Sequence, residues 1–314
     1  MPTQVSVIIP TFRRPDGLRR AADSVLAQAN PCGLSIELII VDNDPDGSAM
    51  AQGQAIAKEA AVPVKVVHMP SPGVANARNA GLDASSGELI AFLDDDEEAP
   101  VTWLCELVGS LRFYDADVVF GPVRTRLPDS VTAHREYYSQ FFARSGPEES
   151  GHIDHYHGCG NSLIRREALP SDQPFDAARN DIGGEDDLLF AQMQAIGAVF
   201  AWSAEAWVWE DPLTHRASLN YTLKRAFAYG QGPSVACASS RPVNLPGLVF
   251  WMCVGAAQAV VYGSAAAVLW AVGAPQRARM LDKAVRGLGK VFWGGPFSLG
   301  FYGTAALRGQ AAAS

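Results

Sequence analysis

The sequence lacks several motifs that mark common binding sites. It contains neither G-x-G-x-x-G nor G-x-x-x-x-G-K-[ST], so no dinucleotide-binding loop or P-loop is expected. It has no C-x-x-C pair, which argues against a zinc site of that kind. Its five cysteines are odd in number and widely spaced, which fits reduced thiols in the cytosol better than a disulfide framework. Any phosphate group would therefore have to be held by a metal ion and side chains.

The chain also lacks an excess of positive charge. It has 25 lysines and arginines against 33 acidic residues, a net charge of −8, which argues against nucleic acid as a partner. The N-terminus lacks the basic start and small-residue cleavage site of a signal peptide and runs almost directly into the apolar Val5–Pro10. We therefore expect the N-terminal part to be a cytosolic domain.

Alternating strand and helix patterns fill the first 120 residues. Apolar runs predict strands at 5–10, 36–41, 64–68, 88–93 and 117–120, with helices between them at 16–28, 48–61, 74–84 and 101–114. Such alternation is typical of an α/β fold with a doubly wound, mostly parallel sheet. After Gly121 the pattern is less regular, with helices expected at 134–144, 186–196 and 219–228 and short strands among them.

Carboxylates follow two of these strands directly. Asp42 and Asp44 come after the second, and Asp94, Asp95 and Asp96 after the fourth. The carboxyl ends of parallel strands share one edge, where open α/β sheets bind ligands. Three adjacent carboxylates repel one another, which is tolerable if a divalent cation shares their site. The alternative is a solvated, inert acidic turn.

Two further elements carry charged groups that suit a binding cleft. Arg78, on the helix after the third strand, is a natural partner for phosphate, although it fits a solvated helix arginine as well. Glu185, Asp186 and Asp187 follow Gly183-Gly184 at the start of an apolar helix, where acids also favour the helix dipole. Presented into a cleft, one of them could instead accept a proton from an attacking hydroxyl.

Taken in order, these motifs resemble those of family 2 glycosyltransferases with the GT-A fold. The matching segments are Val-Ser-Val-Ile-Ile-Pro-Thr-Phe-Arg-Arg (5–14), Leu-Ile-Ile-Val-Asp-Asn-Asp (38–44), Gly-Val-Ala-Asn-Ala-Arg-Asn-Ala-Gly (73–81), Phe-Leu-Asp-Asp-Asp (92–96) and Gly-Gly-Glu-Asp-Asp-Leu (183–188). Residues 209–230 are similar to the subgroup that builds bacterial exopolysaccharides. Five motifs in the family's order are far more specific than any one of them.

The resemblance implies a role for each matching residue in inverting sugar transfer from a UDP-sugar. Asp186 would be the catalytic base, with Glu185 the second choice, and Asp96, with Asp94, would bind Mn²⁺ or Mg²⁺. The implied nucleotide-sugar contacts are Pro10, Thr11, Arg13, Asp42 (to the uracil), Asp44, Arg78, Asp95 (near the ribose) and Asn161 (at the floor of the donor-sugar pocket).

The chain departs from the family's pattern in two places. Some relatives have a histidine metal ligand after the catalytic helix, but His215 lies further along, and we expect it at the surface or on the acceptor side. The processive Q-x-x-R-W motif is absent, which favours transfer of a single sugar.

Two other functions compete with sugar transfer. A nucleotidyltransferase would need a glycine-rich basic loop after the first strand, where this chain has Thr11–Pro15. A non-catalytic scaffold would be expected to lose Asp96 or the Glu185–Asp186 pair, and all three residues are present.

The C-terminal part differs in composition from the rest. Pro242–Gln276 contains 35 residues without a formal charge, long enough to cross a bilayer once. Arg277–Lys290 carries five basic residues and one acid in the pattern of an amphipathic helix on an anionic membrane surface. A single crossing would place this basic segment outside, so a hairpin or re-entrant insertion within 242–276 is expected. Apolar helices buried in a dimer interface are the alternative.

These observations predict two parts of the chain. Residues 1–235 would form the GT-A domain, with a nucleotide-binding half at 1–121 and an acceptor and catalytic half at 122–235. Residues 236–314 would associate with the membrane, which places the enzyme at the cytoplasmic face of a bacterial inner membrane, acting on a lipid-linked or saccharide acceptor.

Overall fold

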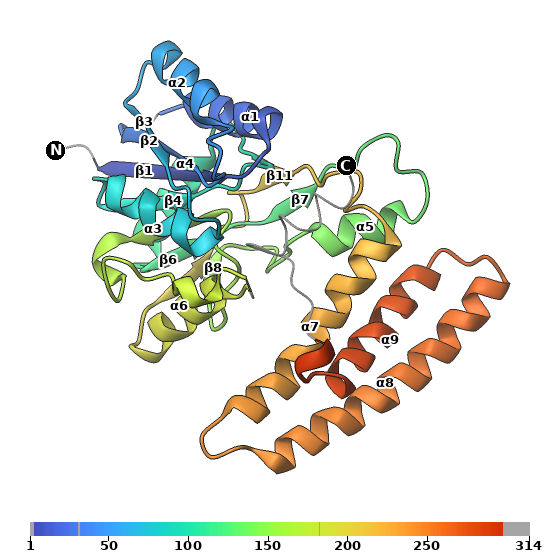
Figure 1. Ribbon diagram of the computed structural model, residues 1–314. Helices are drawn as coiled ribbons and strands as arrows, with labels where there is room; N and C mark the ends of the chain where they lie inside the picture. The colour runs from blue at the N-terminus through green and yellow to red at the C-terminus, as the bar shows by residue number, and fades with distance from the viewer. Residues whose placement is uncertain (1–2, 31, 182, 298–314) are drawn as a thin grey trace. The chain divides into compact units, whose positions relative to one another are not determined.

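The computed structural model describes residues 3–30, 32–181 and 183–297, drawn as the coloured ribbon in Figure 1. The chain forms two compact units. Among the described residues, the first unit contains 3–124 and 143–211, and the second contains 125–142 and 212–297. The domain boundary predicted at residue 235 falls within a helix of the second unit, and residues 298–314 of the predicted membrane segment lie outside the described residues.

The first unit is built on an eight-stranded sheet with the order β3-β2-β1-β4-β9-β6-β10-β8. Its strands are β1 (Gln4–Thr11), β2 (Ser35–Asp42), β3 (Val64–His68), β4 (Leu89–Phe92), β6 (Val118–Phe120), β8 (Gly151–Ile153), β9 (Ser162–Arg165) and β10 (Phe200–Trp202). Strands β1 to β4 are mutually parallel, as is β10 with β6. β9 runs antiparallel between β4 and β6, and β8 is antiparallel to β10. The predicted mostly parallel α/β sheet is confirmed, while the insertion of β9 between β4 and β6 was not anticipated.

Helices cover both faces of this sheet (Figure 1). α1 (Pro15–Leu26), α2 (Met50–Glu59) and α4 (Trp103–Phe113) share one apolar core with alternate residues of β1, including Val7. α3 (Val74–Ala84) and α6 (Glu185–Ala195) share the core on the other face with Ile8. Successive strand residues point to opposite faces, so the apolar strand runs require cover on both sides.

A three-stranded sheet of order β5-β11-β7 adjoins the carboxyl end of β4. It consists of β5 (Glu97–Glu98), β7 (Val123–Thr125) and β11 (Val208–Glu210). β5 starts directly after Asp96, and Trp209 of β11 pairs with Glu98. Two short 3-10 turns complete the described elements of this unit, η1 (Arg166–Ala168) and η2 (Ala177–Arg179).

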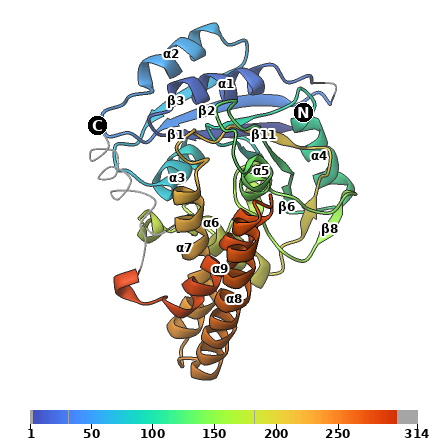
Figure 2. The same cartoon turned by 90° about the vertical axis from the view of Figure 1, so that its right-hand side faces the viewer.

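The second unit is helical. Its elements are α5 (Arg135–Phe142), α7 (Leu219–Ser239), α8 (Leu245–Ala271), α9 (Arg277–Val291) and the short η3 (Gly295–Phe297). Figure 2 shows α7, α8 and α9 side by side. Within the described part of the chain, one helix, α8, is long and apolar enough to cross a membrane, with a mean hydropathy of 1.6.

The hairpin predicted within 242–276 is wrong. α8 is one continuous helix of 27 residues, and the chain turns back only after Ala271. Gly255 serves the packing of this helix against α9. A side chain at Gly255 would collide with the backbone oxygen of Gly287 in α9. α9 thus packs closely along α8.

Candidate active site

The carboxyl ends of β1, β2 and β4 bring the predicted acids together at one edge of the large sheet. Thr11, which ends β1 after Pro10, is in register with Asp42 at the end of β2. On the other side of β1, Ile8 pairs with Phe92, two residues before Asp94. The two acidic segments therefore flank the end of the central strand, as the parallel pattern predicts.

Asp42 and Asp44 have structural partners at this edge. The buried Asp42 carboxylate accepts the backbone N–H groups of Asp44 at 3.0 Å and Ala49 at 2.7 Å. Arg13 donates two hydrogen bonds to Asp44, from Nε at 3.1 Å and from Nη2 at 3.0 Å. These contacts hold the loop between β2 and α2. That Asp42, Asp44 and Arg13 contact a nucleotide stays a prediction.

Asn43, which sequence reasoning passed over, ties this loop to α3. Its Nδ2 donates to the carbonyl oxygens of Met69 and Ser71, and its Oδ1 accepts the N–H of Gly73 at 2.7 Å. Gly73 has a φ of 139°, in the region that favours glycine, and directly precedes α3. Asn43 thereby orients the helix that carries Arg78.

Of the three consecutive aspartates after β4, Asp95 and Asp96 share Arg14 as a partner. Asp95 accepts hydrogen bonds from Thr11 Oγ1 at 2.8 Å and from Arg14 at 3.3 Å, while Arg14 Nη1 also binds Asp96 Oδ2. Burial, followed by the charge of Asp96, raises the pKa of Asp95 to about 7. Arg14, which was not among the predicted site residues, is thus the arginine that reaches the acidic segment.

Asp94 contacts Glu97 and Arg78. Its backbone N–H donates to Glu97 Oε2 at 2.9 Å, and its side chain lies 3.6 Å from Arg78 Nη2. Desolvation by the surrounding protein raises the pKa of Asp94, which the charge of Arg78 opposes. Burial and the nearby Asp94 raise the pKa of Glu97 well above its ordinary value.

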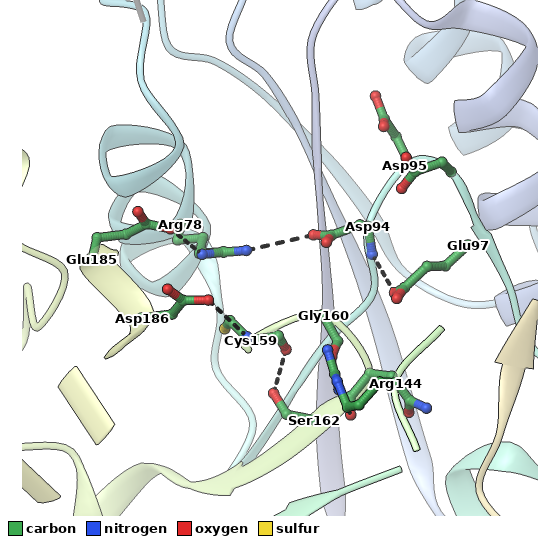
Figure 3. A network of polar contacts seen from close by, with 12 residues as sticks. Arg78, Asp94, Asp95, Glu97, Arg144, Cys159, Gly160, Ser162, Glu185 and Asp186 are labelled. Carbon is green, nitrogen blue, oxygen red and sulfur yellow. Dashed lines mark hydrogen bonds and ion pairs between the residues drawn. The ribbon is translucent and has the colours of Figure 1, made fainter. Parts of the chain in front are cut away.

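Arg78 links three elements of the site (Figure 3). Its Nη1 lies 2.5 Å from Glu185 Oε1 at the start of α6, and its guanidinium stacks over the ring of Phe175. Only 6% of its side chain is exposed. The alternative of a solvated helix arginine is therefore wrong. Burial alone would lower the pKa of Arg78, but the acidic groups around it outweigh that effect and raise it.

The first turn of α6 separates the two candidate bases. Gly183 and Gly184 have φ values of 83° and 77°, which glycine adopts most easily, and they lead the chain into the helix. Glu185 is buried against Arg78. Asp186 instead points at the glycine-rich loop, where its Oδ2 accepts the N–H of Cys159 at 3.1 Å. The structure therefore leaves Asp186 better placed than Glu185 to meet a substrate hydroxyl.

Asn161 is fully buried beneath that loop. Its Oδ1 accepts from Trp103 Nε1 at 2.7 Å, and its Nδ2 donates to the carbonyl oxygens of Pro122 and Ala206. Its φ of 50° is unusual for a residue other than glycine. Asn161 therefore shapes the predicted pocket floor, and direct contact with a sugar stays a prediction.

Arg144 is a second charged residue that sequence reasoning missed. Its Nη1 donates to the carbonyl of Gly160 at 2.6 Å, and Figure 3 shows Arg144 and Asp186 on either side of the Cys159–Gly160 segment. A Cβ on Gly158 would lie 3.3 Å from Asp186 Oδ2 and 3.6 Å from Arg144 Nη2. The bare Cα of Gly158 thus leaves space between a carboxylate and a guanidinium. No local motif marks Arg144, because its hydrogen-bond partners lie 16 or more residues away.

The carboxylates of Asp94 and Asp96 suit a hard divalent cation. Among the described residues, no three His, Cys, Asp or Glu side chains are grouped as a ready metal site. Mg²⁺, however, is commonly held by one or two carboxylates together with substrate phosphates and water. A side chain at Gly160 would lie 2.6 Å from Asp94 Oδ2, so this glycine keeps the space beside the carboxylate open. The donor set therefore fits Mn²⁺ or Mg²⁺ bound together with a diphosphate.

Comparison with known proteins agrees with this geometry. A family model described as "Glycosyl transferase family 2" matches residues 6–171. The succinoglycan biosynthesis protein ExoM of Rhizobium meliloti is 35% identical over 229 residues, which are 72% of this chain and 73% of ExoM.

Solved structures share the fold at lower identity. The mannosyltransferase PcManGT from Pyrobaculum calidifontis, in complex with GDP-Man and Mn²⁺, has a TM-score of 0.59 at 18% identity, covering 93% of this chain and 88% of its own. S. aureus TarS 1–349 in complex with UDP has a TM-score of 0.50 at 16% identity, covering 92% and 90%. These likenesses confirm the predicted GT-A type of fold. Because the family model spans more than half of the residues and ExoM aligns with most of the chain, this protein belongs to glycosyl transferase family 2 and is a glycosyltransferase.

Proposed function

We propose that the enzyme transfers a single sugar from a UDP-sugar, with inversion, to a hydroxyl of a lipid-linked or saccharide acceptor in exopolysaccharide biosynthesis. One observation carries the proposal. Asp186 lies against the Cys159–Gly160 segment, and the ion pairs of Arg78 join the same helix turn to Asp94 at the edge of the sheet. A proton acceptor and the acids suited to a diphosphate–metal complex thus converge on one site.

The chemistry follows from this placement. Asp186 accepts the proton of the acceptor hydroxyl while the hydroxyl oxygen attacks the anomeric carbon. The bond from that carbon to the diphosphate oxygen breaks in the same step, so the configuration inverts and UDP leaves. Positioned general-base catalysis contributes about 10²–10⁴-fold. Glu185 is unsuited to this role because its carboxylate is paired with Arg78.

The cofactor in this proposal is Mn²⁺ or Mg²⁺, held by Asp96 and Asp94 with the donor diphosphate. When bound, the cation would neutralise negative charge on the departing UDP. Two structural neighbours were solved with nucleotides, TarS with UDP and PcManGT with GDP-Man and Mn²⁺, which supports a nucleotide-sugar donor. The proposed nucleotide-sugar contacts are Pro10, Thr11, Arg13, Asp42, Asp44, Arg78, Asp95 and Asn161.

The acceptor and the location follow from the relative and from the composition of the C-terminal part. ExoM is named for succinoglycan biosynthesis, which supports a saccharide acceptor. α8 is apolar and mostly exposed, which supports membrane association and hence a lipid-linked acceptor. We place the catalytic domain, residues 1–235, in the cytosol at the inner membrane, with residues 236–314 as the attachment.

The test is a radiolabelled transfer assay with membrane extract as the acceptor source, a panel of UDP-sugars and GDP-mannose. Asp186→Asn should abolish transfer and leave UDP binding, measured by calorimetry, nearly unchanged. The matched control is Asp172→Asn, which removes a carboxylate from an exposed loop. Transfer retained by Asp186→Asn would refute the assigned base, and transfer from GDP-mannose alone would refute the UDP-sugar donor.

A further inference from the structure

α8 exposes apolar side chains along its whole length. Leu245 at its start is 62% exposed, Val260 and Val261 near its middle 69% and 62%, and Val268 near its end 63%. Only 11% of its most apolar window is buried within the protein. A soluble protein rarely leaves so long an apolar surface in water, so α8 requires a cover.

α9 runs antiparallel along α8 at close range. The Lys283 ammonium lies 5.0 Å from the ring centre of Tyr262, and the Arg277 guanidinium 5.3 Å from that of Trp270. A Cβ on Gly263 would touch Ala284. Basic side chains of α9 therefore lie at the same level along the helix axis as the middle and the end of α8.

Polar contacts also fix α9 to the other helices of its unit. Asp282 accepts hydrogen bonds from Tyr137 of α5 at 3.1 Å and from Arg286 at 2.7 Å. Ser234 of α7 donates to the backbone oxygen of Lys290 at 2.7 Å. Separating α9 from this bundle would cost the buried Asp282 its hydrogen bond from Tyr137 and break the contact of Ser234 with α9, so α8 and α9 are best treated as one body.

A transmembrane α8 conflicts with this packing. It would carry α9 into the hydrocarbon, with the five basic residues of Arg277–Lys290 and the acidic Asp282. Charged groups are costly at that depth, and they are accommodated where long side chains reach the interface.

Granted the membrane association proposed for the chain, we infer that α8 and α9 lie together in the plane of an anionic membrane surface. The apolar side of α8 enters the acyl boundary, and the basic side chains of α9 contact lipid phosphates. This arrangement covers the apolar surface of α8 and keeps the charges at headgroup level.

Cysteine labelling at the two ends of α8 separates lying from spanning. Val243→Cys and Val272→Cys place thiols at exposed positions just before and just after the helix. The full chain is expressed in a bacterial host and treated with a membrane-impermeant maleimide, with the wild type as the background for the native cysteines. We expect neither variant to gain label in intact cells and both to gain it in opened cells. Label at one end in intact cells would overturn the in-plane arrangement.

Vesicle binding tests the headgroup contact. The probes are vesicles of phosphatidylcholine alone and of phosphatidylcholine with phosphatidylglycerol. Arg279→Gln removes an exposed charge of α9 and should weaken binding to the anionic vesicles about fivefold, in line with the usual contribution of one basic residue. The matched control, Lys58→Gln, removes an exposed lysine from α2 and should bind like the wild type. Equal binding by Arg279→Gln and the wild type would overturn the contact.

A different failure would reach the proposed function itself. If the wild type binds neither vesicle and forms a dimer in light scattering, a second copy of the chain covers α8, and both the in-plane arrangement and the membrane association fall. UDP binding by the same preparation then shows whether the proposed UDP-sugar donor site still stands.

Discussion

Replacing Arg78 by methionine should destabilise the first unit strongly, because the change leaves a buried carboxylate without its partner. Arg78 and Glu185 are each only 6% exposed, and their side chains meet at 2.5 Å. Removing one member of such a pair costs about 3–5 kcal/mol, since the remaining charge stays desolvated. For a domain of roughly 200 residues this corresponds to a drop in melting temperature on the order of 10 °C. Asp94 adds less to the cost, because its side chain is 38% exposed and reaches water.

A double substitution distinguishes this cause from general disruption. Arg78→Met with Glu185→Leu removes both charges and keeps similar volumes, so most of the lost stability should return. The control is Arg19→Met, which breaks exposed ion pairs and should leave the melting temperature close to that of the wild type.

Thermal unfolding followed by circular dichroism measures all four proteins. A double variant as unstable as Arg78→Met, or a single variant that melts with the wild type, would refute the reasoning.

Three further substitutions test other parts of the first unit. Arg14→Gln should tighten Mn²⁺ binding in the absence of nucleotide, measured by calorimetry, because it frees Asp96 from the competing guanidinium of Arg14. An unchanged affinity for Mn²⁺ would contradict this expectation. Gly158→Ala should lower the transfer rate on the order of 10²-fold and leave UDP binding intact, because its methyl group fills the space beside Asp186. The matched control is Gly151→Ala, whose methyl group meets no neighbouring atom within 4 Å. Equal activity of the two variants would argue against a role for the space at Gly158. Burial opposes ionisation of Glu37, but hydrogen bonds from two serines and a lysine outweigh it and lower the Glu37 pKa to about 2. The ionised Glu37 therefore stabilises the folded protein fully above about pH 4.5, and this stabilisation is lost as the pH falls toward 2. Glu37→Gln should make the melting temperature depend less steeply on pH in this acid range. An acid range as steep as that of the wild type would contradict the assignment.

The sequence predicts the sheet and its ligand-binding edge well, because both depend on local patterns. Apolar runs such as Ile36–Val41 fit buried strands, and the first polar residue after each run marks the strand's end. The first four strands, from Gln4 to Phe92, are mutually parallel, so the acids after them had to meet at one edge. The place of β9 in the sheet was missed because an antiparallel insertion between β4 and β6 has no local signature.

The sequence also predicted the wrong path for the C-terminal part. Charge spacing suggested a turn within residues 242–276, but α8 continues through Gly255 and Gly263. Gly255 allows the close approach of α9, and the spacing of charges along the sequence does not show whether an apolar segment turns or continues as one helix.

The sequence by itself determined the fold class, the family and the set of acids at the edge of the sheet, because strand periodicity and short motifs are local. Only the tertiary structure decided which charged groups are engaged. It paired Glu185 with Arg78, placed Arg14 on Asp96, and brought Arg144 to the loop that faces Asp186. These pairings join residues from 16 to 107 positions apart, so they depend on how whole elements pack against one another.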